Sequence, residues 1–309
     1  MKQIVTFYRL PGLNGLLGKC QFFWRAGVFM ALACFVTIIV TLIQPAAHAY
    51  DVVIDPASPR QGDTVSILVT ARHGTGTSPT VTVNGTPYPT FAIGNDRYRT
   101  FVPSSPLHAV GRYVIQVTGT EEPRNPAFWL GDRDFATQYI NLPPGRRNLG
   151  TDHEFDRVDA FKRIISPEKL WSGAFRRPSQ GYVSSEYGFR RYYNGVFAQN
   201  YYHRGIDYAA PIGSPVISPA AGKVVLVGRV ADGFELHGNT IGIDHGQGVA
   251  SIFIHLNSID VQEGQTVEAG DTIGTIGTTG ASTGPHLHWG LYVNGVAVDP
   301  APWRSGSLE

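Results

Sequence analysis

Short runs of alternating hydrophobic and polar residues fill most of the chain after residue 50. This period of two predicts β-strands with one buried face. The clearest runs before residue 142 are 64–70, 80–83 and 113–117. Asn84-Gly85 directly follows the second run and predicts a tight hairpin turn. The pattern is typical of a small immunoglobulin-like β-sandwich over residues 50–142.

A helical period replaces the strand period in residues 143–174. The apolar residues at helical spacing are Phe155, Val158, Phe161, Ile164 and Ile165. They predict one amphipathic helix whose apolar stripe packs on a core. Pro167 is expected to end it, because proline removes a backbone hydrogen bond. We therefore interpret residues 143–174 as a connector with one helix.

Strand-like runs return between residues 175 and 303. The clearest are 223–227, 240–243, 250–254 and 286–293. No repeated helix separates them, so a doubly wound parallel sheet is disfavoured and a mainly antiparallel β domain is expected. The predicted fold class is all-β, with an N-terminal sandwich, a helical connector and a C-terminal β domain.

The N-terminal segment has the order of an export signal. Residues 1–25 contain four basic residues and no acid, residues 26–43 are apolar and uncharged, and Ala47-His48-Ala49 follows. This order predicts a signal peptide over residues 1–49, cut after Ala49. The alternative is an uncleaved membrane anchor, because the apolar run is almost long enough to span a bilayer. Both interpretations place the rest of the chain in the periplasm or cell wall, tethered to the inner membrane only by an uncleaved anchor.

Charge and cysteine content narrow the classes of function. The formal net charge is +1, and no basic cluster follows the N-terminal segment, so a nucleic-acid partner is not expected. Cys20 and Cys34 both lie in that segment. A metal site in the remaining chain must therefore use histidine and carboxylate ligands.

Six of the ten histidines lie between residues 203 and 288. His203 and Asp207 form His-x-x-x-Asp, and His286 and His288 form His-x-His, which places its two side chains on one face of a strand. A catalytic zinc keeps three protein ligands and an open fourth position. His203, Asp207 and His288 would supply such a set for one Zn2+ per chain. His286 and His255 would remain as free imidazoles.

Several segments resemble the lysostaphin-type (LytM-type) zinc endopeptidase family in the family's order. They are residues 184–191, 203–211, 220–224, 243–248 and 284–289. The resemblance covers about residues 175–303, whereas the N-terminal half matches only loosely. It implies a zinc metalloendopeptidase that hydrolyses the peptide part of bacterial peptidoglycan.

The resemblance also implies roles for individual residues. The family's metal ligands fall on His203, Asp207 and His288, and its catalytic histidines fall on His255 and His286. No ligand is missing, although some relatives have lost zinc and only activate other enzymes. Ile254 departs from the family, which often has a small residue there.

Proton transfer is expected to use an imidazole, because the chain has no His-Glu-x-x-His motif to supply a glutamate base. Either His255 or His286 could be the base, and the other could stabilise the oxyanion. Tyr201 and Tyr202 could add a phenol donor or simply pack.

Other histidines and motifs have simpler interpretations. His73 and His108 are isolated and are expected in surface loops. His237 and His245 could be extra ligands, but Asp244-His245-Gly246 is interpreted as a polar turn. Gly280–Gly284 matches Gly-x-Ser-x-Gly, yet Pro285 follows, so a loop is expected rather than a nucleophile elbow.

Two other functions compete with the enzyme. One is a non-catalytic wall-binding activator on the same scaffold, which the complete ligand set disfavours. The other is a lipoyl-like carrier suggested by residues 267–273, which lacks a lysine for the cofactor. Within the family, we expect cleavage of stem-peptide cross-links rather than glycine bridges, because the additional domain precedes the catalytic one. The sequence does not determine the oligomeric state.

Overall fold

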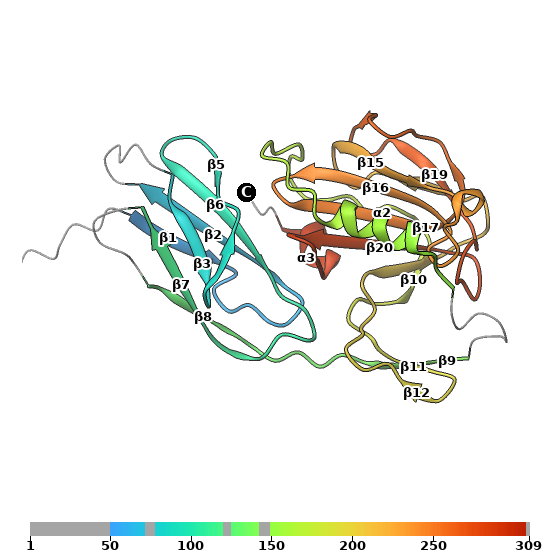
Figure 1. Cartoon of the computed structure of the whole chain (residues 1–309), viewed down its shortest axis with the longest axis horizontal. Helices are drawn as coiled ribbons and strands as arrows, with labels where there is room; N and C mark the ends of the chain where they lie inside the picture. The colour runs from blue at the N-terminus through green and yellow to red at the C-terminus, as the bar shows by residue number, and fades with distance from the viewer. Residues whose placement is uncertain (1–49, 72–77, 120–124, 142–148, 307–309) are drawn as a thin grey trace, which may run out of the picture. The chain divides into compact units, whose positions relative to one another are not determined.

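The computed structural model describes residues 50–71, 78–119, 125–141 and 149–306 (Figure 1). Ala49–Glu309 forms one compact unit. The predicted mainly antiparallel all-β class is confirmed in the described ranges. The predicted export segment 1–49 and His73 lie outside them. No helix within the described ranges is long and apolar enough to cross a membrane.

The N-terminal part consists of two four-stranded antiparallel sheets. One has the order β1 (Tyr50–Asp55), β2 (Thr64–Ala71), β6 (Arg97–Pro103), β5 (Phe91–Ala92). The other has the order β4 (Thr86–Tyr88), β3 (Thr80–Val83), β7 (Gly111–Thr118), β8 (Ala127–Leu130). All three predicted strands are present.

Alternating apolar residues of the two sheets share one core. Ile67 of β2 and Ile115 of β7 are fully buried in it. Asn84 and Gly85 both have positive φ, 48° and 80°, as the predicted hairpin turn between β3 and β4 requires. The arrangement is a β-sandwich, and its immunoglobulin-like type stays a prediction.

A small sheet follows the sandwich in the chain. It has the order β12 (Val196–Phe197), β11 (Arg190–Tyr193), β9 (Thr137–Ile140), and β9 runs parallel to β11. β9 thus lies before the predicted boundary at residue 142 but pairs with a strand from beyond residue 175. The predicted domain boundaries themselves stay predictions.

The connector contains the predicted helix, α2 (Asp152–Lys162). Thr151 caps its N-terminus by accepting a hydrogen bond from the Glu154 amide at 3.1 Å. The helix ends five residues before Pro167. The predicted apolar stripe is confirmed at Val158 and Phe161, which are buried, but it is wrong at Phe155, which is 42% exposed. Ile164 and Ile165 lie beyond the end of the helix, and Ile165 is 47% exposed. Glu154 is instead fully buried. Buried donors from the C-terminal domain surround the Glu154 carboxylate, which explains this reversal.

A ten-stranded sheet forms the C-terminal domain. Its main path is β10 (Tyr182–Ser185), β13 (Ile206–Ala209), β20 (His286–Val293), β17 (Val249–Ile259), β16 (Asn239–Gly246), β15 (Gly222–Gly228), β18 (Thr266–Val267). Branches are β14 (Pro215–Ile217), β19 (Thr272–Ile276) and β21 (Val296–Val298), and the remaining elements are η1 (Val230–Asp232) and α3 (Pro300–Ser305). Figure 1 shows α2 lying against this sheet. A Cβ at Gly242 would lie 2.7 Å from the Phe161 ring, so glycine permits this close packing.

Candidate metal centre

Strand register brings the two histidine motifs together. β13 and β20 pair antiparallel, with Asp207 opposite His288 and Ala209 opposite His286. Side chains of directly opposed residues point to the same face of a sheet. His203 precedes β13, and its Nε2 lies 3.0 Å from Asp207 Oδ1 and 2.9 Å from His288 Nδ1. Residues 81 or more positions apart therefore converge on one point.

The turn between His203 and β13 depends on Gly205. A Cβ on this residue would lie 2.3 Å from the Trp289 carbonyl oxygen and 2.8 Å from His288 Nε2. Any larger residue would push the turn away from β20. Glycine at this position therefore allows His203 to reach His288.

The donor atoms suit a metal cation. His203 Nδ1 donates to the Glu186 carbonyl oxygen at 2.7 Å, so a neutral His203 ring presents a lone pair at Nε2. That lone pair faces the Asp207 carboxylate, so two hydrogen-bond acceptors face each other. The donor atoms of His203, Asp207 and His288 all lie within 4.8 Å of one another. Two imidazole nitrogens and one carboxylate oxygen form a ligand set that zinc accepts, with a fourth position left open.

The protonation states also suit metal binding. Burial alone would raise the pKa of Asp207, but His203 and His288 hold that pKa well below its usual value. Burial lowers the pKa of His288 to about 4, despite its hydrogen bond to Asp207. At neutral pH the carboxyl group is therefore ionised and the His288 ring is neutral, as metal coordination requires.

His255 and His286 lie beside these donors with their ring centroids 4.9 Å apart. Each ring is oriented by a backbone carbonyl, because Nδ1 of His255 donates to Thr279 and Nδ1 of His286 donates to Gly284, both at 2.8 Å. The remaining nitrogen, Nε2, is then the acceptor of each neutral ring. Burial, and then the neighbouring His286, hold the pKa of His255 well below its usual value.

All five predicted site residues line one cavity of about 400 Å³. His255 has φ of 66°, a left-handed conformation that non-glycine residues rarely adopt outside functional or tightly packed sites. The predicted assignment of three residues to the metal and two to proton transfer stays a prediction.

Two other predicted residues, Tyr202 and His245, are structural. The Tyr202 hydroxyl is buried and donates to the Ala297 carbonyl oxygen at 3.0 Å. The predicted turn at Asp244-His245-Gly246 is wrong, because β16 continues to Gly246. His245 is fully buried there, within 2.9 Å of the Ala221 carbonyl and 2.8 Å of the Ser251 hydroxyl.

The remaining candidates lie outside the donor set. His237 Nδ1 is 2.7 Å from the buried Glu154 carboxylate rather than at the metal donors. The 280–284 segment is a loop that enters strand β20, as predicted, and no helix follows it. His108 Nδ1 contacts the Ser105 hydroxyl at 2.9 Å within the sandwich.

Two residues near the metal-donor side chains were not identified from the sequence. Arg191 forms an ion pair with Asp207 at 3.5 Å, and Gln138 accepts a hydrogen bond from Arg191. Arg191 is the last residue of segment 184–191, which resembles the family, and no other feature of the sequence marked it. No local pattern marks Gln138, since it reaches the site only through the pairing of β9 with β11.

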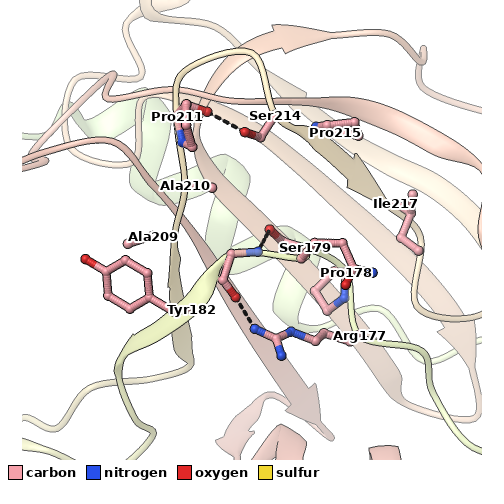
Figure 2. Close-up of a pocket in the computed structure, with 12 residues that line it drawn as sticks. Arg177, Pro178, Ser179, Tyr182, Ala209, Ala210, Pro211, Ser214, Pro215 and Ile217 are labelled. Atoms are coloured by element: carbon pink, nitrogen blue, oxygen red, sulfur yellow. Dashed lines mark hydrogen bonds between the residues drawn. The ribbon is translucent and has the colours of Figure 1, made fainter.

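Cavities adjoin the donor cavity on two sides. One, of about 520 Å³, lies between residues 177–182 and 209–217 and shares Tyr182 and Ala209 with the donor cavity. Figure 2 shows residues that line it, among them Arg177, whose side chain donates to the Gly181 carbonyl oxygen. The other, of about 670 Å³, shares Arg191, His255 and His288 with the donor cavity. The donors therefore lie in a cavity that has a further cavity next to it on each side.

The larger side cavity is basic. Its cationic lining residues are Lys162, Arg191 and Arg204, and the histidines His237, His255 and His288 line it as well. No aspartate or glutamate is among the described residues that line it. This cavity therefore favours an anionic occupant over a neutral one.

A β domain that presents two imidazoles and a carboxylate in an open cavity belongs to the class of mononuclear metal-binding domains typical of metallopeptidases. Residues 201–300 match the family model described as Peptidase family M23. This part of the chain is therefore a peptidase M23 domain, as the sequence resemblance predicted.

Similar proteins extend this assignment. The chain is 40% identical over 118 residues to the "DD-carboxypeptidase/endopeptidase Mpg" of Neisseria meningitidis and 38% identical over 118 residues to the "Peptidoglycan DD-endopeptidase ShyC" of Vibrio cholerae. Each alignment covers 38% of this chain and only 26% of the relative. A putative peptidase M23 from Pseudomonas aeruginosa matches in structure with a TM-score of 0.59 and 28% identity. That match covers 82% of this chain and 96% of the other, so it extends well beyond residues 201–300.

Proposed function

We propose that the protein is an exported zinc metalloendopeptidase that hydrolyses peptide cross-links of bacterial peptidoglycan. The observation that supports this most directly is the arrangement of donors in their cavity. Three ligand atoms converge at its centre, and two further imidazoles beside them present acceptor nitrogens. The N-terminal signal pattern supports export to the periplasm or cell wall.

The residues of the centre have distinct proposed tasks. His203, Asp207 and His288 hold the ion, which when bound activates water and polarises a peptide carbonyl. Since Nδ1 of His255 and of His286 donates to a backbone carbonyl, Nε2 is the acceptor nitrogen that each ring presents to the reacting groups. We assign the general base to His286, because its Nε2 lies 3.9 Å from Asp207 Oδ1, the oxygen that faces the metal position, and therefore close to where a metal-bound water would lie. His255, with its lowered pKa, stays neutral and orients the reacting groups by accepting a hydrogen bond.

The charge of the larger side cavity favours stem peptides over glycine bridges. Stem peptides have free carboxylates along their length, whereas pentaglycine has none between its ends. The basic lining of the larger side cavity is suited to such carboxylates. Relatives named peptidoglycan DD-endopeptidases point to the same class of substrate.

A competition between two substrates tests this proposal. Residues 50–309 would be incubated with a cross-linked stem-peptide dimer and pentaglycine at equal concentration, and products would be identified by mass spectrometry. We expect monomeric stem peptides and intact pentaglycine. Cleavage of pentaglycine alone would contradict the substrate assignment. Stoichiometric zinc without hydrolysis of either substrate would instead favour the non-catalytic activator.

Arg204 provides a sharper test of the basic cavity. This exposed guanidinium lies 5.4 Å over the Tyr201 ring and lines the cavity without being a metal donor. We expect Arg204→Glu to raise KM for the dimer about tenfold while kcat changes little, equivalent to about 1.4 kcal/mol of lost binding. Lys223→Glu, an exposed residue of β15 that lines none of these cavities, is the matched control. An unchanged KM in Arg204→Glu would show that Arg204 does not contact the substrate.

A further inference from the structure

We propose that Gln138 and Arg191 are positioning residues for Asp207, so that strand β9 is an integral part of the metal centre. This inference rests on the metal site of the proposed function, but not on the substrate. Gln138 lies well before the M23 domain at residues 201–300. The domain therefore depends on a strand supplied by the preceding chain.

The first contact is the hydrogen bond between Gln138 and Arg191. β9 and β11 pair in parallel with Gln138 beside Arg191. The Gln138 Oε1 atom accepts a hydrogen bond from Arg191 Nε at 2.9 Å, and Gln138 Nε2 donates to the Ser185 hydroxyl at 3.0 Å. Ser185 is itself the β10 partner of Asp207 in the strand register. Gln138 thus ties the guanidinium to the strand next to Asp207.

The second contact orients the carboxylate. A terminal nitrogen of Arg191 lies 3.5 Å from Asp207 Oδ2, while Asp207 Oδ1 is the oxygen that faces His203 and His288. Only 12% of the Arg191 side chain is exposed, so this charge is weakly screened by solvent. Arg191 therefore holds one carboxylate oxygen away from the metal position and directs the other toward it.

Such outer contacts have measurable effects on metal sites. Partners that orient a ligand typically change metal affinity by about 10–100-fold when they are removed. The planar guanidinium can bond Gln138 through Nε while a terminal nitrogen faces Asp207, which the single nitrogen of lysine cannot do. Gln138 should therefore act on the metal only through Arg191.

Zinc affinity of the full mature chain, measured by competition with a chromophoric chelator, tests the inference without any substrate. We expect Arg191→Met to weaken affinity by about 10–100-fold and Gln138→Met by about threefold to tenfold. Gln138→Glu, which keeps an acceptor for Arg191 Nε, should retain most of the affinity. Thr137→Ala, at the exposed neighbouring position of β9, should match the wild type.

The double variant separates positioning from general damage to the fold. If Gln138 acts through Arg191, adding Gln138→Met to Arg191→Met should cause no further loss of affinity. Fully additive losses, or wild-type affinity in Gln138→Met, would overturn the inference while leaving the proposed function intact. A wild-type chain that binds no zinc would overturn both. If Gln138→Met proves unfolded by circular dichroism, Arg191→Lys decides, because lysine keeps the charge but cannot bond Gln138 and face Asp207 together, so wild-type affinity in Arg191→Lys would overturn the inference.

Discussion

The metal centre depends on which nitrogen of each imidazole faces the donors. His203, His255 and His286 all direct Nδ1 to a backbone carbonyl, which leaves Nε2 for the cavity. His288 is reversed, since its Nδ1 lies 2.8 Å from Asp207 Oδ1. The carbonyl contacts set tautomer and ring orientation before any ligand binds.

Removal of any one of the three proposed metal ligands should abolish metal binding. We expect His203→Ala, Asp207→Ala and His288→Ala each to lose stoichiometric zinc and all hydrolysis, because two ligands do not retain the ion. Metal content after dialysis, measured by mass spectrometry, checks this. His108→Ala, in the sandwich, should keep both zinc and activity. A donor variant that retained one zinc per chain would exclude that residue as a ligand.

The two imidazoles beside the donors should affect rate rather than metal content. We expect His286→Ala, which removes the proposed base, to retain zinc but to lose roughly two to four orders of magnitude in kcat, and His255→Ala, which removes the orienting imidazole, to retain zinc and lose kcat as well. Zinc content and single-turnover rates would be measured on the same preparations. Loss of zinc in His286→Ala would mean that the roles of His286 and His288 are exchanged.

Among the elements, α2 is linked to the site by one buried carboxylate. Glu154 accepts hydrogen bonds from the amides of Leu236 and His237 at 3.0 and 2.6 Å and contacts His237 Nδ1 at 2.7 Å. The His237 carbonyl in turn accepts a hydrogen bond from the His255 amide at 2.9 Å. The helix thereby supports the backbone of a predicted catalytic residue.

Glu154→Gln should destabilise the protein in a pH-dependent way. Burial alone would raise the pKa of Glu154, but the donors from His237 and Leu236 hold it below the ordinary 4.5. A lowered pKa means that the stabilisation is present above pH 4.5 and is lost as the pH falls through the folded-state value. We expect a deficit of about 1.5–3 kcal/mol at pH 6 that shrinks below pH 4.5.

Urea unfolding of wild type and variant across this pH range gives the difference in free energy. Asp156→Asn, at an exposed position of the same helix, is the control and should show little effect. A deficit in Glu154→Gln that stayed constant down to pH 3 would contradict an electrostatic role for Glu154.

At the scale of the whole molecule, the sandwich and the C-terminal domain share packing contacts. Phe101 of β6 is fully buried and packs on Trp171 and Trp303, with ring centroids 6.1 and 5.6 Å apart. A terminal nitrogen of Arg99, also in β6, donates to Gln247 Oε1 at 2.7 Å. Phe101, Trp171 and Trp303 belong to the hydrophobic core of the C-terminal domain rather than to that of the sandwich.

Truncation of Phe101 should therefore destabilise both parts together. We expect Phe101→Ala to cost about 3–5 kcal/mol, the usual range for removal of a buried phenylalanine ring. In urea, tryptophan fluorescence and circular dichroism should report the same shifted transition. Trp129→Ala, in the sandwich and 66% exposed, should leave the midpoint nearly unchanged. Two separate transitions, with only the sandwich affected, would contradict a shared core.

Local features of the sequence determined the strand pattern, the Asn84-Gly85 turn, the presence of one connector helix and the His-x-x-x-Asp and His-x-His spacing. Each depends on neighbours only a few residues apart, so chain periodicity and turn chemistry suffice to predict it. Tertiary structure decided the rest. The β13–β20 register placed Asp207 opposite His288, and the β9–β11 pairing brought Gln138 to Arg191. Glu154 became buried and Phe155 exposed because distant backbone donors solvate a carboxylate but not an aromatic ring. Such contacts join residues dozens of positions apart, and their energy appears only when the chain has folded.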